Sequence, residues 1–391
     1  MKIHLVLFSM LIVSALRAQS LDPKILEEIK VKAKSTHSDA LLIRHNGKII
    51  HEEYSSQKQE PIYIASAGKS LVSLAIGRLL KKKQLDSLDQ PVWTLFPEWK
   101  QGMKKEITIR MLLNHTSGLQ NNPNASVELE PAPTYKVKNV IQLALAAELS
   151  SVPGSKVEYN NKAVALLGGI IEKASGKRMD IFFKDEFFIP LGITKYSWIQ
   201  DETGNPTAHG AFVLLPRDLL KFGELMLNNG EYNGTKLLDE TWIQESWKQS
   251  QSFSPIWGLL WWRLPKFERR IIDEEIINSW KAGGVDKSFI KQLQPLQGIT
   301  FENKFTFFAA LANSLGENWN EVLNEKLQGK LQSSKRIYSS EIIAYYADGY
   351  RGNYLVIIPQ KNIIAVRCAD NEGFNYGTDS FDEFVELVAK L

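Results

Sequence analysis

The feature that most constrains the fold is the order of two hydrophobic patterns along the 391 residues. Short strand-like runs lie near both ends, whereas residues 66–200 are dominated by apolar side chains spaced three and four apart, which is typical of helices. Because a strand must pair with another strand, the runs at the two ends are expected to meet. The order predicts an α/β (α+β) protein with an antiparallel sheet built from N- and C-terminal segments, flanked by helices and interrupted by a mainly helical domain.

Turn signals support the strand assignment at both ends. Asn46-Gly47 is the pair that most readily adopts the positive φ angles of a two-residue hairpin turn. Near the C-terminus, residues 359–362 (Pro-Gln-Lys-Asn) separate two apolar runs. The predicted strands are residues 41–44, 48–54, 256–263, 354–358 and 363–367, and the predicted helices are residues 66–80, 161–174 and 380–391.

The first eighteen residues have the pattern of a secretory signal peptide. Lys2 precedes a mostly apolar core over residues 4–16, and Ala18 ends a small-residue cleavage site. A retained membrane anchor is the alternative, which Arg17 disfavours because it interrupts an apolar run already short for a bilayer. We therefore expect an exported protein, periplasmic or secreted, with no integral membrane span in the mature chain.

The remaining chain is expected to form one α/β domain interrupted by a second domain. Residues 19–65 are predicted to be its N-terminal part, residues 66–200 the mainly helical domain, and residues 201–391 its C-terminal part. Residues 283–336 fit this plan poorly and are expected to be an insertion.

Composition and residue spacing argue against several classes of function. A formal net charge of +3 does not indicate the strongly basic surface that binds nucleic acid. The only cysteine, Cys368, lies in an apolar run and is expected to be a small core hydrophobe. The six histidines lack paired ligand spacing, so neither a metal nor another cofactor is expected. His115 is interpreted as a loop-packing residue, while His209 is open between packing and a place near the site.

A Ser-x-x-Lys motif at Ser66 and Lys69 is the first candidate for chemistry. The same spacing occurs at Ser55 and Ser288, but only Ser66 follows a strand-like run and opens a long amphipathic helix. Residues three apart share a helix face, and an ammonium held against a helix interior loses hydration, which lowers its pKa. Lys69 is therefore a candidate base for the Ser66 hydroxyl, which also lies where helix N–H groups stabilise negative charge. The alternative is an N-cap serine beside a surface lysine.

Tyr159 and Asn161 are the second candidate pair. Of the twelve tyrosines, only Tyr159 has an asparagine two residues later, and the pair comes directly before a predicted helix. A phenol near a lysine can act as a general base because the cation favours phenolate, and an amide can orient the lysine or a substrate carbonyl. A tyrosine at a strand end followed by a helix cap is the alternative.

The two motifs together resemble the first two signatures of serine β-lactamases and penicillin-binding proteins, in the branch of class C β-lactamases, DD-peptidases and related esterases. Residues 107–119 (Ile-Thr-Ile-Arg-Met-Leu-Leu-Asn-His-Thr-Ser-Gly-Leu) resemble the family's loop between these motifs, and residues 216–223 resemble the start of a later helix. The likeness covers about residues 40–250 and the C-terminal hairpin. It implies a β-lactamase/transpeptidase-like fold with an acyl-transfer site on the two motifs.

The third signature departs from the family's usual pattern. Where the family carries Lys-Thr-Gly, Lys-Ser-Gly or a His-x-Gly variant, the matching segment here is Tyr350-Arg351-Gly352, followed by Asn353. Gly352 keeps the glycine that lets a substrate backbone approach the strand closely. The Arg351 side chain could bind a substrate carboxylate or face solvent, and the sequence leaves both alternatives open. By position, the oxyanion hole would be the backbone N–H groups of Ser66 and Asn353. Loss of the lysine disfavours efficient β-lactam hydrolysis.

The resemblance implies a serine hydrolase for an amide or ester. Ser66 would attack a carbonyl, Lys69 and Tyr159 would move its proton, and water would release the acyl-enzyme. The expected partner is a small-molecule or peptide acyl substrate, and neither its identity nor the oligomeric state follows from the sequence. The alternative is a non-catalytic envelope receptor that binds acyl or peptidoglycan-like ligands in the same cleft. Three aromatic residues are open between core packing and a cleft wall, namely Trp257, Trp261 and Trp262.

Overall fold

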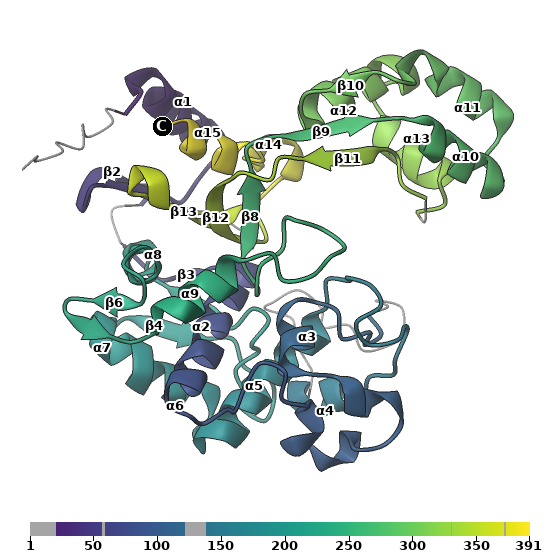
Figure 1. Cartoon of the computed structure of the whole chain (residues 1–391). Helices are drawn as coiled ribbons and strands as arrows, with labels where there is room; N and C mark the ends of the chain where they lie inside the picture. The colour runs from purple at the N-terminus through teal and green to yellow at the C-terminus, as the bar shows by residue number, and fades with distance from the viewer. Residues whose placement is uncertain (1–20, 57–58, 122–137, 330, 371–372) are drawn as a thin grey trace, which may run out of the picture.

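The main sheet joins the two ends of the chain. A computed structural model describes residues 21–56, 59–121, 138–329, 331–370 and 373–391, so the predicted signal peptide lies outside the described residues. Six antiparallel strands form one sheet in the order β2-β1-β14-β13-β12-β8 (Figure 1). The strands are β1 (Ala40–His45), β2 (Lys48–Tyr54), β8 (Trp262–Pro265), β12 (Ile342–Gly349), β13 (Asn353–Ile358) and β14 (Ile363–Cys368). The predicted sheet of N- and C-terminal segments is confirmed.

Both predicted hairpins are present in this sheet. Asn46 and Gly47 have φ angles of 47° and 80°, as a two-residue hairpin turn requires. Strands β13 and β14 pair across the C-terminal turn. The expected strand at residues 256–263 is wrong in its bounds. The Gly258 N–H donates to the Trp261 carbonyl, and this turn delays the start of β8 until Trp262.

Helices cover both faces of the sheet. Leu41 points to the face that packs against α1 (Pro23–Ser35) and α15 (Phe384–Lys390). Leu42 points to the opposite face, which packs against the helical region. Cys368 is buried on this second face, as expected for a small core hydrophobe. Because both faces are buried, β13 and β14 are buried along their whole length.

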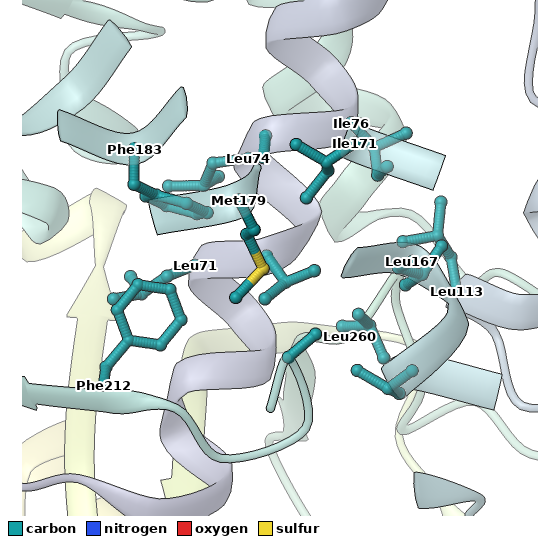
Figure 2. Close-up of a cluster of buried hydrophobic side chains, with 14 of the residues drawn as sticks. Leu71, Leu74, Ile76, Leu113, Leu167, Ile171, Met179, Phe183, Phe212 and Leu260 are labelled. Atoms are coloured by element: carbon teal, nitrogen blue, oxygen red, sulfur yellow. The ribbon is translucent and has the colours of Figure 1, made fainter. Parts of the chain in front are cut away.

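Helix α2 (Gly68–Lys81) is the central element of the helical region. Figure 2 shows its Leu71, Leu74 and Ile76 among apolar side chains from other segments, including Phe212 and Leu260. A helix enclosed in this way fixes the position of the residues at its N-terminal end. The other helices of this part of the chain are α3 (Ile109–Leu113), α4 (Val140–Ala146), α5 (Asn161–Ser175), α6 (Met179–Phe183), α7 (Ile189–Leu191), α8 (Pro216–Leu227) and α9 (Glu240–Trp247).

Short strands complete this part of the structure. They form a sheet in the order β3-β5-β4 and a separate pair, β6 and β7. These strands are β3 (Ile62–Tyr63), β4 (Tyr196–Trp198), β5 (Phe212–Leu214), β6 (Glu231–Tyr232) and β7 (Thr235–Lys236).

Among the described residues, no helix is long and apolar enough to cross a bilayer.

The segment near residues 283–336 belongs to a separate packing unit. Trp280, Phe307 and Leu311 are fully buried in its own hydrophobic cluster. Figure 1 shows this unit extending outward from the end of the main sheet at β8 and β12. The unit begins earlier than expected because its first strand, β9, pairs with its last, β11. Its elements are β9 (Glu268–Ile271), α10 (Glu274–Ala282), α11 (Lys287–Leu293), β10 (Thr300–Phe301), α12 (Lys304–Leu315), α13 (Trp319–Lys326) and β11 (Lys335–Tyr338).

Candidate active site

Ser66 lies in a tight helical turn, η1 (Ala65–Ala67), between β3 and the N-terminal end of α2. Ala65 has a φ of 49°, so the chain bends sharply just before Ser66. The turn runs directly into α2, which places Lys69 on the same face as Ser66. The Lys69 Nζ donates to the Ser66 Oγ at 2.7 Å. The structure therefore brings the predicted serine and lysine into direct contact.

Lys69 is buried, with 3% of its surface exposed. Its Nζ also donates to the backbone carbonyl of His209 at 2.6 Å, so His209 meets the site through its main chain. Burial lowers the pKa of Lys69 to about 7, and the charge of Asp348 opposes this shift. A large fraction of Lys69 is therefore neutral at physiological pH, and its lone pair is available to take a proton from Ser66.

Tyr159 reaches the pair from the loop that precedes α5. The Lys69 Nζ lies 4.9 Å from the centre of the Tyr159 ring, and Tyr159 lines the same pocket as Ser66. Burial raises the pKa of Tyr159 to about 12, and the charge of Asp348 adds to this shift, while the nearby Ser66 hydroxyl opposes it. This pKa does not favour the expected cation-stabilised phenolate, because desolvation disfavours the charged form of a phenol. Tyr159 keeps its proton at neutral pH and is suited to donate it.

His115 holds the Tyr159 loop in place. Its Nδ1 accepts from the Asn160 N–H at 3.1 Å, and its carbonyl accepts from the Glu158 N–H at 2.8 Å. The imidazole ring lies 4.8 Å from the Tyr159 ring, centre to centre. Burial lowers the pKa of His115 to about 3, so the ring is neutral. These contacts agree with the predicted loop-packing role.

Asn161, the second residue of the Tyr-x-Asn motif, is the first residue of α5. Its Oδ1 is buried and has no hydrogen-bond partner among the described residues. It is not among the residues that line the pocket beside Ser66. The neighbouring Asn160 caps the helix, since its Oδ1 accepts from the Ala163 N–H at 2.9 Å. The Asn161 Oδ1 is therefore an unpaired acceptor among the described residues. Of the two residues of the motif, Tyr159 lines the pocket with Ser66 and Asn161 does not.

A narrow pocket with an aromatic wall lies beside Ser66. The Trp257 ring centre is 4.2 Å from that of Trp262 and 6.2 Å from that of Tyr159. Trp261 also lines the pocket, but it is buried and its indole N–H donates to the Ser73 hydroxyl at 3.2 Å. The free volume is about 10 Å³, which is enough for one water. The lining residues are Ser66, Lys69, Ser70, His115, Tyr159, Trp257, Leu260, Trp261, Trp262 and Asp348.

The segment expected to carry the third signature lies outside this pocket. Tyr350, Arg351 and Gly352 form the turn between β12 and β13. Arg351 does not extend freely into solvent, because its Nη1 donates to the Asp370 carboxylate at 2.9 Å, and it is not among the residues that line the pocket beside Ser66. Gly352 has a φ of 72°, and a Cβ there would lie 2.4 Å from the Arg367 guanidinium. This glycine serves the turn rather than the approach of a substrate, which corrects the expectation from the sequence.

Asn353 is also part of the framework rather than of the pocket surface. It is 1% exposed, and its Nδ2 donates to the carbonyls of Tyr350 and Ala369 at 2.7 and 3.1 Å. It pairs with Gly349 as the first residue of β13. Its position inside the sheet makes its backbone N–H an unsuitable second donor for the oxyanion hole.

The part of β12 that adjoins the serine turn lies three residues before the expected signature. Asp348 lines the pocket, and a Cβ at Gly349 would lie 2.3 Å from the Ile64 carbonyl oxygen and 2.9 Å from the Ala67 nitrogen. Neither residue was predicted from the sequence, because Ala347-Asp348-Gly349 has no cationic side chain, whereas Tyr350-Arg351-Gly352 has Arg351. The available signal was a second glycine three residues before Gly352.

Arg367 fixes the turn after Gly349 from within the sheet. It is fully buried, and its Nη1 donates to the carbonyls of Arg351 and Gly352 at 2.8 Å each. Its Nη2 donates to the Asp379 carbonyl at 3.0 Å, and its Nε to the Ser38 hydroxyl at 2.8 Å. Buried donors need partners of this kind. The turn beside the pocket is therefore tied to both ends of the chain.

The antiparallel sheet, its covering helices and the serine at the start of α2 define the β-lactamase/transpeptidase class of fold. A β-lactamase/D-alanine carboxypeptidase structure from Pseudomonas syringae aligns over 94% of this chain and 96% of that chain, with a TM-score of 0.56 and 14% identity. The Beta-lactamase family model matches residues 26–375. The chain belongs to the β-lactamase family.

Two relatives with curated names are enzymes. The chain is 28% identical to esterase EstB from Burkholderia gladioli over 182 residues, which are 42% of this chain and 46% of that protein. It is 20% identical to 6-aminohexanoate-dimer hydrolase from Paenarthrobacter ureafaciens over 240 residues, which are 56% of this chain and 59% of that protein. The matches thus span about half the length of each relative. Among the residues that the structure describes, no group of three or more His, Cys, Asp or Glu side chains could hold a metal ion.

Proposed function

We propose that this chain is a serine hydrolase that cleaves an ester or amide through an acyl-enzyme on Ser66. The observation that carries the proposal is the 2.7 Å contact between the Lys69 Nζ and the Ser66 Oγ, made by a lysine whose pKa burial lowers to about 7. A neutral amine at this distance can act as a general base. Membership of the β-lactamase family and the hydrolase names of two relatives support the proposal.

Acylation begins when Lys69 takes the Ser66 proton and the Oγ forms a bond to the substrate carbonyl carbon. The backbone N–H groups of Ser66 and Tyr350 would hold the resulting oxyanion. Tyr350 replaces Asn353 in this role because it follows Gly349, where β12 comes closest to the serine turn. Tyr159 then protonates the leaving group as the C–O or C–N bond breaks, and the Lys69 ammonium returns a proton to Tyr159.

Deacylation uses Lys69 again as the general base. Lys69 takes a proton from water, whose oxygen attacks the ester carbonyl of the acyl-enzyme. The second tetrahedral intermediate collapses, the bond to the Ser66 Oγ breaks, and Lys69 returns the proton to Ser66. Every proton is thus recovered in one cycle.

We infer that the substrate carries no carboxylate next to the scissile bond. Arg351, the cation expected to bind such a group, is occupied by Asp370 at 2.9 Å. Within the described lining of the pocket, the charged side chains are Lys69, which the chemistry uses, and Asp348, which would repel an anion. This charge pattern favours neutral esters and amides over β-lactams. The signal-peptide pattern of residues 1–18 further supports an exported, periplasmic or secreted enzyme.

Trapping of the acyl-enzyme tests the proposed function. A fluorophosphonate probe, which reacts with activated serines, is expected to add one label per chain, located by peptide mass spectrometry on the peptide that contains Ser66. Ser70 is the internal control, because it lines the same pocket but its hydroxyl donates to the Leu260 carbonyl at 2.6 Å. Labelling of another serine, or no labelling of folded protein, would reject Ser66 as the nucleophile.

The pH dependence of kcat/KM tests the role of Lys69. Because the neutral amine is the active form, kcat/KM for a neutral ester is expected to rise through a midpoint near pH 7. The charge of Asp348 raises the pKa of Lys69, so Asp348→Asn should move this midpoint to lower pH. A midpoint near 10, the ordinary range of a lysine, or a shift to higher pH in the variant, would contradict the assignment.

A further inference from the structure

An exposed aromatic cluster lies at the turn that follows Gly349, beyond the pocket beside Ser66. The ring centres of Tyr350 and Tyr376 are 5.5 Å apart, and those of Phe374 and Tyr376 are 5.1 Å apart. Tyr350 is 50% exposed and Tyr376 is 54% exposed. We call these three residues the aromatic platform. Two large rings are therefore offered to solvent beside the candidate active site.

The platform is ordered by contacts with the chain beneath it. The Arg351 guanidinium lies 5.5 Å from the Tyr350 ring centre and 5.9 Å from that of Phe374. The Tyr376 ring packs against both neighbours, edge-on to Tyr350 and to Phe374. Asp370 holds the guanidinium at 2.9 Å. Because the rings are already ordered, a ligand that stacks on them loses less free energy to side-chain ordering.

The platform continues directly from the nucleophile turn. Gly349 approaches the backbone of Ile64 and Ala67 on either side of Ser66, and Tyr350 is the next residue. Asn353 and Arg367 fix the carbonyls of Tyr350 and Arg351. The platform therefore begins at the residue that follows the point where β12 approaches the nucleophile turn.

The charges around the platform disfavour a negatively charged ligand. The guanidinium beneath the platform, that of Arg351, is paired with Asp370. A second carboxylate lies close by, because the Asp39 Oδ2 accepts from the Asp370 N–H at 2.6 Å. Because the Arg351 guanidinium is already paired, an anion would gain no new ion pair there. A flat ring with an apolar face would instead stack on the exposed tyrosines.

We propose that Tyr350, Phe374 and Tyr376 form a substrate subsite that stacks on a ring without negative charge, carried by the substrate beyond its scissile ester or amide bond. The inference rests on the proposed function, because it places a second part of the same substrate. An aromatic ring and the apolar face of a sugar share the required chemistry.

Ligand affinity in the Ser66→Ala protein tests the subsite without the chemical step. Dissociation constants are measured by NMR titration for phenyl acetate, for a neutral acetylated methyl glucoside and for ethyl acetate, which has no ring. At least one ring ligand is expected to bind about tenfold more tightly than ethyl acetate, a factor typical of one aromatic stacking contact. The phenyl and sugar ligands distinguish the two sources of a ring.

Substitutions in the platform test whether its tyrosines cause the preference for a ring ligand. Tyr350→Ala and Tyr376→Ala, each added to Ser66→Ala, should reduce the ring preference to about onefold, because the stacking contact, about 1.4 kcal/mol for a tenfold preference, is removed. Tyr350→Phe should retain it. Phe305→Ala is the matched control, since Phe305 is 41% exposed on α12 in the insertion.

Equal affinities for all three ligands, or a ring preference that survives both tyrosine substitutions, would overturn the subsite. The native enzyme is assayed with the same three esters as a separate measurement. Failure to hydrolyse any of them would count against the proposed function, while the binding constants would still decide whether the platform recognises a ring.

Discussion

Ser66→Ala is expected to lower kcat/KM for p-nitrophenyl acetate by at least about 10³-fold, because the substitution removes the proposed nucleophile. The fold should remain intact, since the substitution removes one oxygen from a turn whose backbone contacts are unchanged. Lys69 loses its 2.7 Å contact with the Ser66 Oγ but keeps the one with the His209 carbonyl. Steady-state kinetics and thermal unfolding of the purified variant check both expectations.

Two serines provide controls for this experiment. Ser288 has the same Ser-x-x-Lys spacing, but it is exposed near the start of α11 and donates to Asp286, so Ser288→Ala should retain full activity. Ser70→Ala removes a buried hydrogen bond to the Leu260 carbonyl and should cost about 1 kcal/mol of unfolding free energy. Its effect on kcat/KM should stay below about tenfold. Activity retained in Ser66→Ala, or lost in Ser288→Ala, would contradict the assignment of the nucleophile.

Gly349→Ala is expected to lower kcat/KM by about 10²-fold, the effect of misplacing reacting groups by roughly 1 Å. The new Cβ would lie 2.3 Å from the Ile64 carbonyl oxygen and 2.9 Å from the Ala67 nitrogen. Both neighbours are backbone atoms, so they cannot move aside as a flexible side chain could. Strand β12 and the serine turn must separate, and overpacking of this kind also costs about 1–3 kcal/mol of unfolding free energy.

Kinetics and urea unfolding measure the two effects of Gly349→Ala. Gly373→Ala is the matched control, because a Cβ at Gly373 would meet nothing within 4 Å. The control should change neither kcat/KM nor the unfolding midpoint. Native activity and stability in Gly349→Ala would show that the close approach of β12 to Ser66 is unimportant.

Local patterns in the sequence predicted the main sheet and the serine and lysine of the candidate site. The Asn46-Gly47 turn and the two C-terminal apolar runs were sufficient because hairpins form between neighbours in the chain. The Ser66 and Lys69 contact was also predictable, since residues three apart on one helix must share a face. Residues 283–336 were not assigned, because their strands are short and pair only across the whole insertion.

The third signature shows where local pattern fails. Tyr350-Arg351-Gly352 matched by position and by its glycine, but that glycine is used by a turn packed on Arg367, and the glycine beside Ser66 is Gly349. Spacing along the chain does not reveal which of two nearby glycines meets a segment almost three hundred residues earlier. Likewise, nothing near Arg351 in the sequence identified Asp370 as its partner.

The sequence by itself predicted the main sheet, the central helix and the candidate serine–lysine pair, because hydrophobic period and helical spacing are properties of neighbouring residues. Only the tertiary structure decided their protonation states and surroundings. Burial lowers the pKa of Lys69 to about 7 and raises that of Tyr159 to about 12. The physical reason is that desolvation depends on the segments that enclose a group, and these come from distant parts of the chain.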